Sequence, residues 1–158
     1  MKKFLTIILT VIAINVNAQH LTFEGLELGC DFKTLDDHAN KMGWKYMDYG
    51  CGTVEYFGEF LSNTVVFTFN IEDNVVEDSV KMMDWSDYAR NTFKNVIRHC
   101  LRNGKEINHT TETTPSETKT YYIDEYTFLM DDGYEWIVSY RDVHRNLRPL
   151  TLITIRKH

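Results

Sequence analysis

The most regular stretch of this chain is a strand-like alternation over residues 65–71. Its two alternating sets are, on one side, Val65, Phe67, Phe69 and Ile71 and, on the other, Val66, Thr68 and Asn70. Successive side chains of an extended chain point to opposite faces, so this pattern predicts a strand with one face against a core. Asp73 and Asn74 follow, and both accept the positive φ angles of a tight hairpin. We therefore expect residues 75–83 to return antiparallel.

Other strand-like runs are separated by short turns. We expect an opening strand over residues 21–28 and further strands over residues 44–49, 53–61, 120–130, 134–142 and 150–157. Turns are expected at residues 50–52, 62–63 and 131–133, where Gly, Asn, Asp and Ser gather. Residues 105–119 are polar, rich in threonine and include Pro115. We expect this segment to be a connection without regular structure.

Two helices are predicted from three- and four-residue spacing. The first spans residues 34–42, with Thr34 as N-cap and Gly43 as the stop. The second spans residues 84–102, with Asp84 as N-cap and Gly104 as the stop. Its apolar stripe consists of Trp85, Tyr88, Ala89, Phe93, Val96, Ile97, Cys100 and Leu101.

The predicted order is β-α-ββββ-α-βββ. Strands joined by short turns favour an antiparallel meander over parallel βαβ units. We expect an α+β fold of two layers, with both helices on one face of the sheet. Each half is a helix followed by a run of strands, which suggests an internal structural pseudo-repeat.

The first eighteen residues resemble a bacterial export signal. Lys2 and Lys3 precede an apolar run from Phe4 to Ile14, and Val16-Asn17-Ala18 then puts a β-branched and a small residue at the two positions that a signal peptidase reads. The run is shorter than the roughly 20 residues that cross a bilayer. We predict a signal peptide over residues 1–18, cleaved between Ala18 and Gln19, and a single domain over residues 19–158. The product is expected in the periplasm or outside the cell, with no membrane span after cleavage.

The net charge of the chain bears on which classes of binding partner are expected. The chain has 17 Lys and Arg against 23 Asp and Glu, a formal charge of −6. Loss of Lys2 and Lys3 with the leader leaves 15 basic and 23 acidic residues, a formal charge of −8. Nucleic acids and anionic lipids attract clustered basic residues, so neither is an expected partner.

Three cysteines remain in the predicted mature chain. Cys30 and Cys51 lie in loop-like settings, and export permits a disulfide between them. Such a bridge closes a loop of about 20 residues and stabilises the fold by roughly 3 kcal/mol. Two unpaired thiols are the alternative. Cys100 lies on the apolar stripe of the second helix, which favours a buried thiol.

The predicted mature N-terminus resembles a known group of proteins. Residues 19–28 read Gln-His-Leu-Thr-Phe-Glu-Gly-Leu-Glu-Leu, and this His-Leu-x-Phe-x-Gly opening is similar to that of small exported proteins of unknown function from gut Bacteroidota. Gly43-Trp44, the Gly-x-Phe element at Gly58 and Trp85 also match. The likeness covers residues 19–58 well and the rest loosely. It implies export and a small α+β fold, without an activity or site residues.

No motif for catalysis, a metal or a cofactor stands out. The six histidines are scattered, and no Cys-x-x-Cys, Gly-rich phosphate loop or Gly-x-Ser-x-Gly occurs. His99 and Cys100 are adjacent, so on a helix they point about 100° apart. Asp78-Ser79-Val80 resembles the tripeptide that Bacteroidota glycosylate in exported proteins, which makes Ser79 a candidate for modification. We expect no cofactor and no enzyme activity.

Function is predicted from an open, aromatic sheet face. Aromatic side chains with one wet side suit peptide, glycan or protein partners. The candidates for this face are Tyr121, Tyr122, Tyr134, Trp136 and Tyr140. The leading hypothesis is an exported non-catalytic binding module acting in the cell envelope. The alternatives are a small periplasmic hydrolase with carboxylates assembled in space and a structural envelope component.

Overall fold

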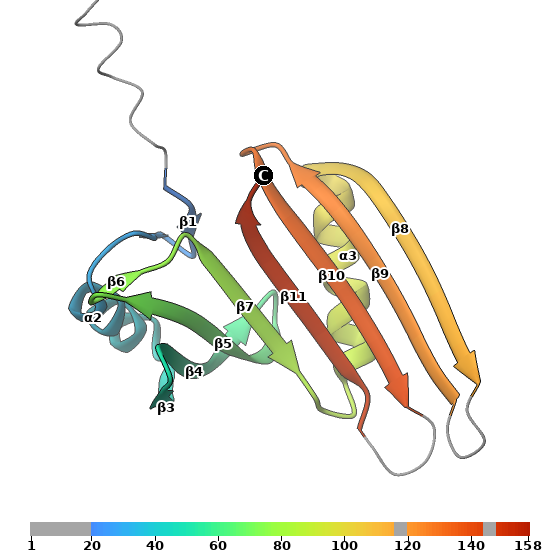
Figure 1. Cartoon of the computed structure of the whole chain (residues 1–158), viewed down its shortest axis with the longest axis horizontal. Coiled ribbons are helices and arrows are strands. Elements are labelled where there is room, and N and C mark those ends of the chain that lie inside the picture. The colour runs from blue at the N-terminus through green and yellow to red at the C-terminus, as the bar shows by residue number, and fades with distance from the viewer. Residues whose placement is uncertain (1–19, 116–119, 144–147) are drawn as a thin grey trace, which may run out of the picture.

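The computed structural model describes residues 20–115, 120–143 and 148–158. The predicted leader and its cleavage site between Ala18 and Gln19 lie outside these residues. The described part is a mixed α+β chain with an antiparallel sheet, as predicted (Figure 1). Its helices are α2 (Phe32–Met42) and α3 (Ala89–Asn103).

Eleven strands make two sheets in the described part. A small hairpin pairs β1 (Thr22–Phe23) with β2 (Leu26–Glu27). The large sheet has nine strands in the order β3-β4-β5-β7-β11-β10-β9-β8, with β6 paired to β5. Their bounds are β3 (Lys45–Gly50), β4 (Thr53–Phe60), β5 (Asn63–Glu72), β6 (Val75–Val76), β7 (Ser79–Asp84), β8 (Gly104–Pro115), β9 (Thr120–Met130), β10 (Tyr134–Val143) and β11 (Leu150–Lys157).

The strand order differs from a simple meander. After α2, strands pair side by side in the order β3-β4-β5-β7, and after α3 they pair in the order β8-β9-β10-β11. The last strands of these two runs, β7 and β11, pair with each other. Thus β7 lies beside the final strand, while the next strand in the chain, β8, forms the far edge (Figure 1). The pairing of β7 with β11 is non-local, and turn residues do not encode it.

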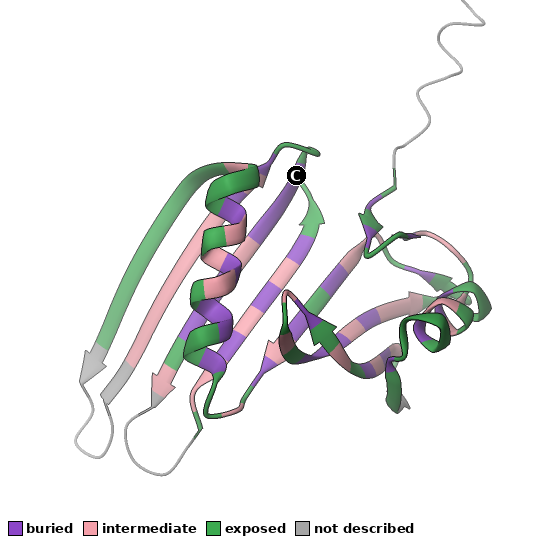
Figure 2. Cartoon of the chain, turned by 180° about the vertical axis from the view of Figure 1, so that it is seen from behind, coloured by how far each residue is buried: buried purple, intermediate pink, exposed green. Residues whose placement is uncertain are grey.

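The prediction of an irregular connection at residues 105–119 was wrong for residues 105–115, which belong to β8, and residues 116–119 lie outside the described residues. This edge strand is exposed from Lys105 to Thr113 (Figure 2). A strand without a buried face shows no apolar alternation, while its many threonines favour extended backbone. A bulge between Glu106 and Asn108 also interrupts its register.

Several element boundaries shift for local reasons. Asp31 caps α2 by accepting a hydrogen bond from the Thr34 amide, so the helix begins before Thr34. The stop at Gly43 is confirmed, with φ of 73°. α3 begins at Ala89 because residues 85–88 form a turn after Asp84. The opening segment divides into β1 and β2, and residues 75–83 divide into β6 and β7.

Tight turns with two left-handed residues connect strands in the first half of the described chain, which runs from β1 to β7: they join β1 to β2, β3 to β4, β4 to β5 and β5 to β6. Both central residues have positive φ at Glu24-Gly25, Cys51-Gly52, Leu61-Ser62 and Asp73-Asn74. This geometry matches the twist of antiparallel hairpins. The predicted turns at residues 50–52 and after Asp73 are therefore confirmed, and the turn at residues 62–63 is displaced by one residue.

One row of opposed residues crosses the sheet and marks the face that the helices contact. Its central members are buried, while its end members on the two edge strands, Tyr46 and His109, are exposed. In strand order the row runs Tyr46, Tyr56, Phe67, Met82, Ile153, Val138, Tyr126 and His109. Both helices contact this face. The Tyr56 hydroxyl donates to Asp36 of α2 over 3.1 Å, and the Thr151 hydroxyl donates to the Ala89 carbonyl of α3 over 2.6 Å.

Aromatic rings fill the core of the first half. Phe67 is fully buried, and its ring centroid lies 4.4 Å from that of Trp44 in a stacked arrangement. Phe23 from the β1–β2 hairpin packs edge-on against Phe67. Gly58 makes room for this stack, because a Cβ there would lie 2.5 Å from Trp44 Cδ1.

Truncation of Phe67 tests this core. We expect Phe67→Ala to lower the free energy of unfolding by about 3–5 kcal/mol, because it leaves a cavity under Trp44. Phe57→Ala on the neighbouring strand is the control, since Phe57 is exposed, and it should cost less than about 1 kcal/mol. Urea unfolding followed by circular dichroism measures both. Equal losses would contradict the assigned faces of the sheet.

Candidate functional site

The aromatic residues predicted to form an open binding face lie mainly in the core. Tyr134, Trp136 and Tyr140 are only 6%, 8% and 4% exposed. Trp136 stacks on His99 of α3 with centroids 5.5 Å apart, and Tyr140 packs against Phe93 of the same helix. These three do not form the expected face, because α3 packs over Trp136 and Tyr140, and Tyr134 is buried on the same side of β10.

The other two predicted residues lie on β9. Tyr122 is half-buried, and its place in the β9 alternation puts it on the same sheet face as Tyr126. The side chain of Tyr121 lies outside the described residues. An aromatic surface built from the predicted set is therefore not present in the described part of the chain.

A different set of apolar side chains, from β3, β4 and the turn after β7, is exposed on one surface. Met47, Phe57, Trp85 and Tyr88 are 46%, 43%, 43% and 72% exposed. All four line one open groove of about 310 Å³, and Val66 and Met83 line it as well. We call the surface of these six residues the β4–β7 groove. Arg148 also lies at this groove.

Strand register explains the floor of the β4–β7 groove. Phe57 lies opposite Val66, and Val66 lies opposite Met83, so one row crosses β4, β5 and β7. This row alternates with the buried row through Tyr56, Phe67 and Met82, which places it on the face opposite the helices. Met47 lies at a bulge in β3, between Tyr46 and Asp48.

The Asp84 carboxylate fixes the wall of the groove. Asp84 is buried, its Oδ1 accepts the Ser86 amide over 2.8 Å, and its Oδ2 accepts the Thr92 hydroxyl over 2.5 Å. The Tyr88 amide donates to Ser86 Oγ over 3.1 Å. These bonds hold the turn that carries Trp85 and Tyr88. The carboxylate is occupied by the fold, which argues against a role for it as an acid or base.

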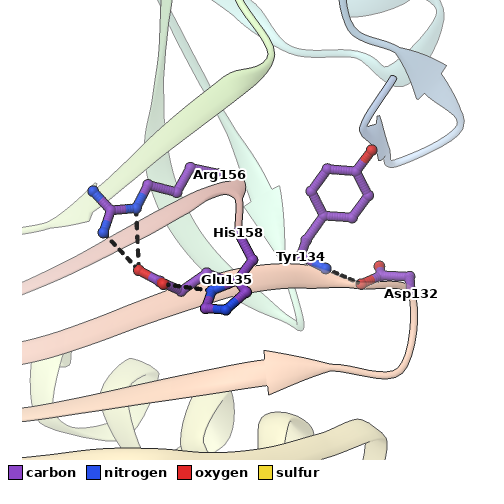
Figure 3. A network of polar contacts seen from close by, with 5 residues as sticks. All are labelled: Asp132, Tyr134, Glu135, Arg156 and His158. Atoms are coloured by element: carbon purple, nitrogen blue, oxygen red, sulfur yellow. Dashed lines mark hydrogen bonds and ion pairs between the residues drawn. The ribbon is translucent and has the colours of Figure 1, made fainter. Parts of the chain in front are cut away.

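A polar network at the opposite end of the sheet joins Glu135, Arg156 and His158 (Figure 3). Glu135 Oε1 accepts from Arg156 Nη2 over 2.7 Å, and His158 Nδ1 lies 3.1 Å from Oε2. Arg156, and less strongly His158, hold the pKa of Glu135 below its usual value. A general acid needs a raised pKa, so this carboxylate suits an ion pair between strands.

A histidine and an aspartate meet on β8 and β9. His109 Nε2 lies 2.7 Å from Asp124 Oδ1, and Thr111 Oγ1 lies 3.3 Å from the same Nε2. In a nucleophile–His–Asp triad the two partners bond to different ring nitrogens. Here both approach Nε2, and the ring stacks on Tyr126 with centroids 3.8 Å apart. This arrangement does not activate the threonine.

The predicted bridge between Cys30 and Cys51 is not formed. Both thiols are free, with Cys30 half-buried and Cys51 exposed. Cys100 is buried as expected, and burial raises the pKa of its thiol to about 12. Its neighbour His99 stacks on Trp136. A thiol that stays protonated is a poor nucleophile.

Three further observations concern the described residues. No group of three or more His, Cys, Asp or Glu there is placed to hold a metal ion. No helix among them is long and apolar enough to span a membrane. Ser79, the candidate for glycosylation, is half-buried in β7.

Sequence reasoning missed the residues of the β4–β7 groove. The available indication was Phe57, an aromatic residue between Glu55 and Glu59 on the polar side of the β4 alternation. The three- and four-residue spacing places Trp85 and Tyr88 on the apolar stripe of the second predicted helix, whereas in the structure they lie in the turn before α3.

Comparison with protein-family models, curated proteins and solved structures finds no match to this chain. No relative therefore assigns a role to the β4–β7 groove, and its function has to follow from its own residues.

Alkylation of the native protein tests the three thiols. Without reductant, Cys51 should react fastest because it is exposed, and Cys30 more slowly because burial raises its pKa. Cys100 should react only after unfolding. Mass spectrometry of peptides after timed labelling measures the order. If Cys30 and Cys51 both resist labelling until a reductant is added, the two are bridged in solution.

Proposed function

We propose that this chain is an exported, non-catalytic binding module that holds apolar side chains of a peptide or protein partner in the β4–β7 groove. The observation that carries the proposal is the convergence of Met47, Phe57, Trp85 and Tyr88, all exposed, on one groove. Contiguous apolar patches of this kind are uncommon on monomers and mark interaction sites.

Burial of the exposed apolar side chains of the groove against a partner favours binding. Burial of one large apolar side chain contributes about 1.5–3 kcal/mol, and tryptophan and tyrosine are enriched among the residues that dominate interfaces. The floor of the groove is formed by paired strands, which limits the ordering cost on binding. The groove is open to solvent, so a partner supplies the opposite wall.

The polar clusters support the hydrolase alternative less well. Arg156 lowers the pKa of Glu135 and so favours its ionised form, and His109 presents the same nitrogen to Asp124 and Thr111. A hydrolase with paired carboxylates needs one of them protonated. Export rests on the leader over residues 1–18, whose Lys-Lys and apolar run resemble a signal peptide.

A peptide array tests the proposal. The full chain is expressed with its leader and purified from the periplasm of a bacterial host, then applied to short peptides of varied apolar content. We expect retention on peptides with clustered Leu, Phe or Met. Trp85→Ser and Phe57→Ser should each weaken binding about tenfold, the loss expected for an interface anchor.

Leu101→Ser is the matched control, because Leu101 is an exposed apolar residue on α3. It should bind as the unaltered protein does. Circular dichroism checks that every variant is folded. Binding that survives both groove substitutions, or that Leu101→Ser weakens equally, would contradict the groove as the site.

A further inference from the structure

Arg148 differs from the other residues at the β4–β7 groove. It is exposed and lies just before β11. Among the described residues no hydrogen bond or ion pair involves its guanidinium, whereas the other charged group at the groove, Asp84, has both oxygens occupied. The groove thus presents one cation without a partner in the described part of the chain.

A partner lying in the groove changes the surroundings of this cation. Docked apolar side chains displace water from the groove, and a guanidinium that loses water without gaining an acceptor is costly. A carboxylate removes that cost, because the planar fork of arginine binds it with two parallel hydrogen bonds. Charge complementarity therefore selects an acidic group next to the apolar ones.

The source of the carboxylate follows from the groove backbone. Terminal carboxylates are captured by nests of free backbone N–H groups. Here Val66 and Met83 lie in paired strands, and the amides of Ser86 and Tyr88 already donate to Asp84 and Ser86. A fatty acid is also a poor fit, because such ligands are mostly enclosed by their pocket and this groove is open.

Building on the proposed function, we propose that the β4–β7 groove recognises a peptide segment in which an Asp or Glu side chain flanks apolar residues. Arg148 binds the acidic side chain. Met47, Phe57, Val66, Met83, Trp85 and Tyr88 contact the apolar residues.

Matched peptides test the inference. All are acetylated and amidated and contain two phenylalanines and a leucine, followed by glutamate, glutamine or lysine. We expect the glutamate peptide to bind the purified protein about tenfold more tightly than its glutamine twin, and the lysine peptide to bind weakest. The Arg148→Gln variant should bind the glutamate and glutamine peptides equally well. Its affinity for both should equal the affinity of the unaltered protein for the glutamine peptide.

Arg102→Gln is the control, since Arg102 is an exposed arginine on α3. Fluorescence anisotropy gives each dissociation constant. Equal binding of the glutamate and glutamine peptides, or a preference that survives Arg148→Gln, would overturn the carboxylate inference and leave the apolar groove standing. A glutamine peptide with a free C-terminus that gains the preference instead would overturn the assignment to a side chain. If none of the peptides binds, the proposed function itself fails.

Discussion

The antiparallel pairing of β7 with β11 joins the two halves of the sheet, and the position of the groove depends on it. The pairing runs from Ser79 opposite Arg156 to Asp84 opposite Thr151. It aligns the buried row through Phe67, Met82 and Ile153 beneath both helices, and no helix of the described residues covers the other face. Because β11 begins where β7 ends, Arg148 lies at the groove with Trp85, which follows Asp84.

Much of the local structure was predictable from the sequence, because it is set by neighbouring residues. The alternation at residues 65–71, the turn at Asp73-Asn74 and the helix stop at Gly43 each depend on nearby side chains. The partner of β7 was not predictable, since that pairing depends on contacts far apart in the chain. The edge strand β8 was not predictable for a different reason, because its side chains are exposed and show no apolar alternation.

The site was harder to predict than the fold. In β10 apolar side chains occur on both faces, with Ile137 between Trp136 and Val138, so its sequence does not say which face α3 covers. The structure places Trp136 in the core and exposes Phe57. Exposure of an aromatic residue depends on which element packs above it, and that information is non-local. The aromatic content of the sequence suggested the class of function that we propose, while the candidate groove residues could be named only from the fold.

Methyl resonances of methionine test the central claim that the open face of the first half is the binding surface. Met83 lies in the β4–β7 groove and adjacent Met82 is buried on the opposite face, so the two methionines form an internal comparison. With methyl-labelled protein and the glutamate peptide at saturation, the resonances of Met47 and Met83 should shift, while those of Met82 and Met130 remain in place. Shifts confined to Met130 or Met42, with Met47 and Met83 unchanged, would contradict the account.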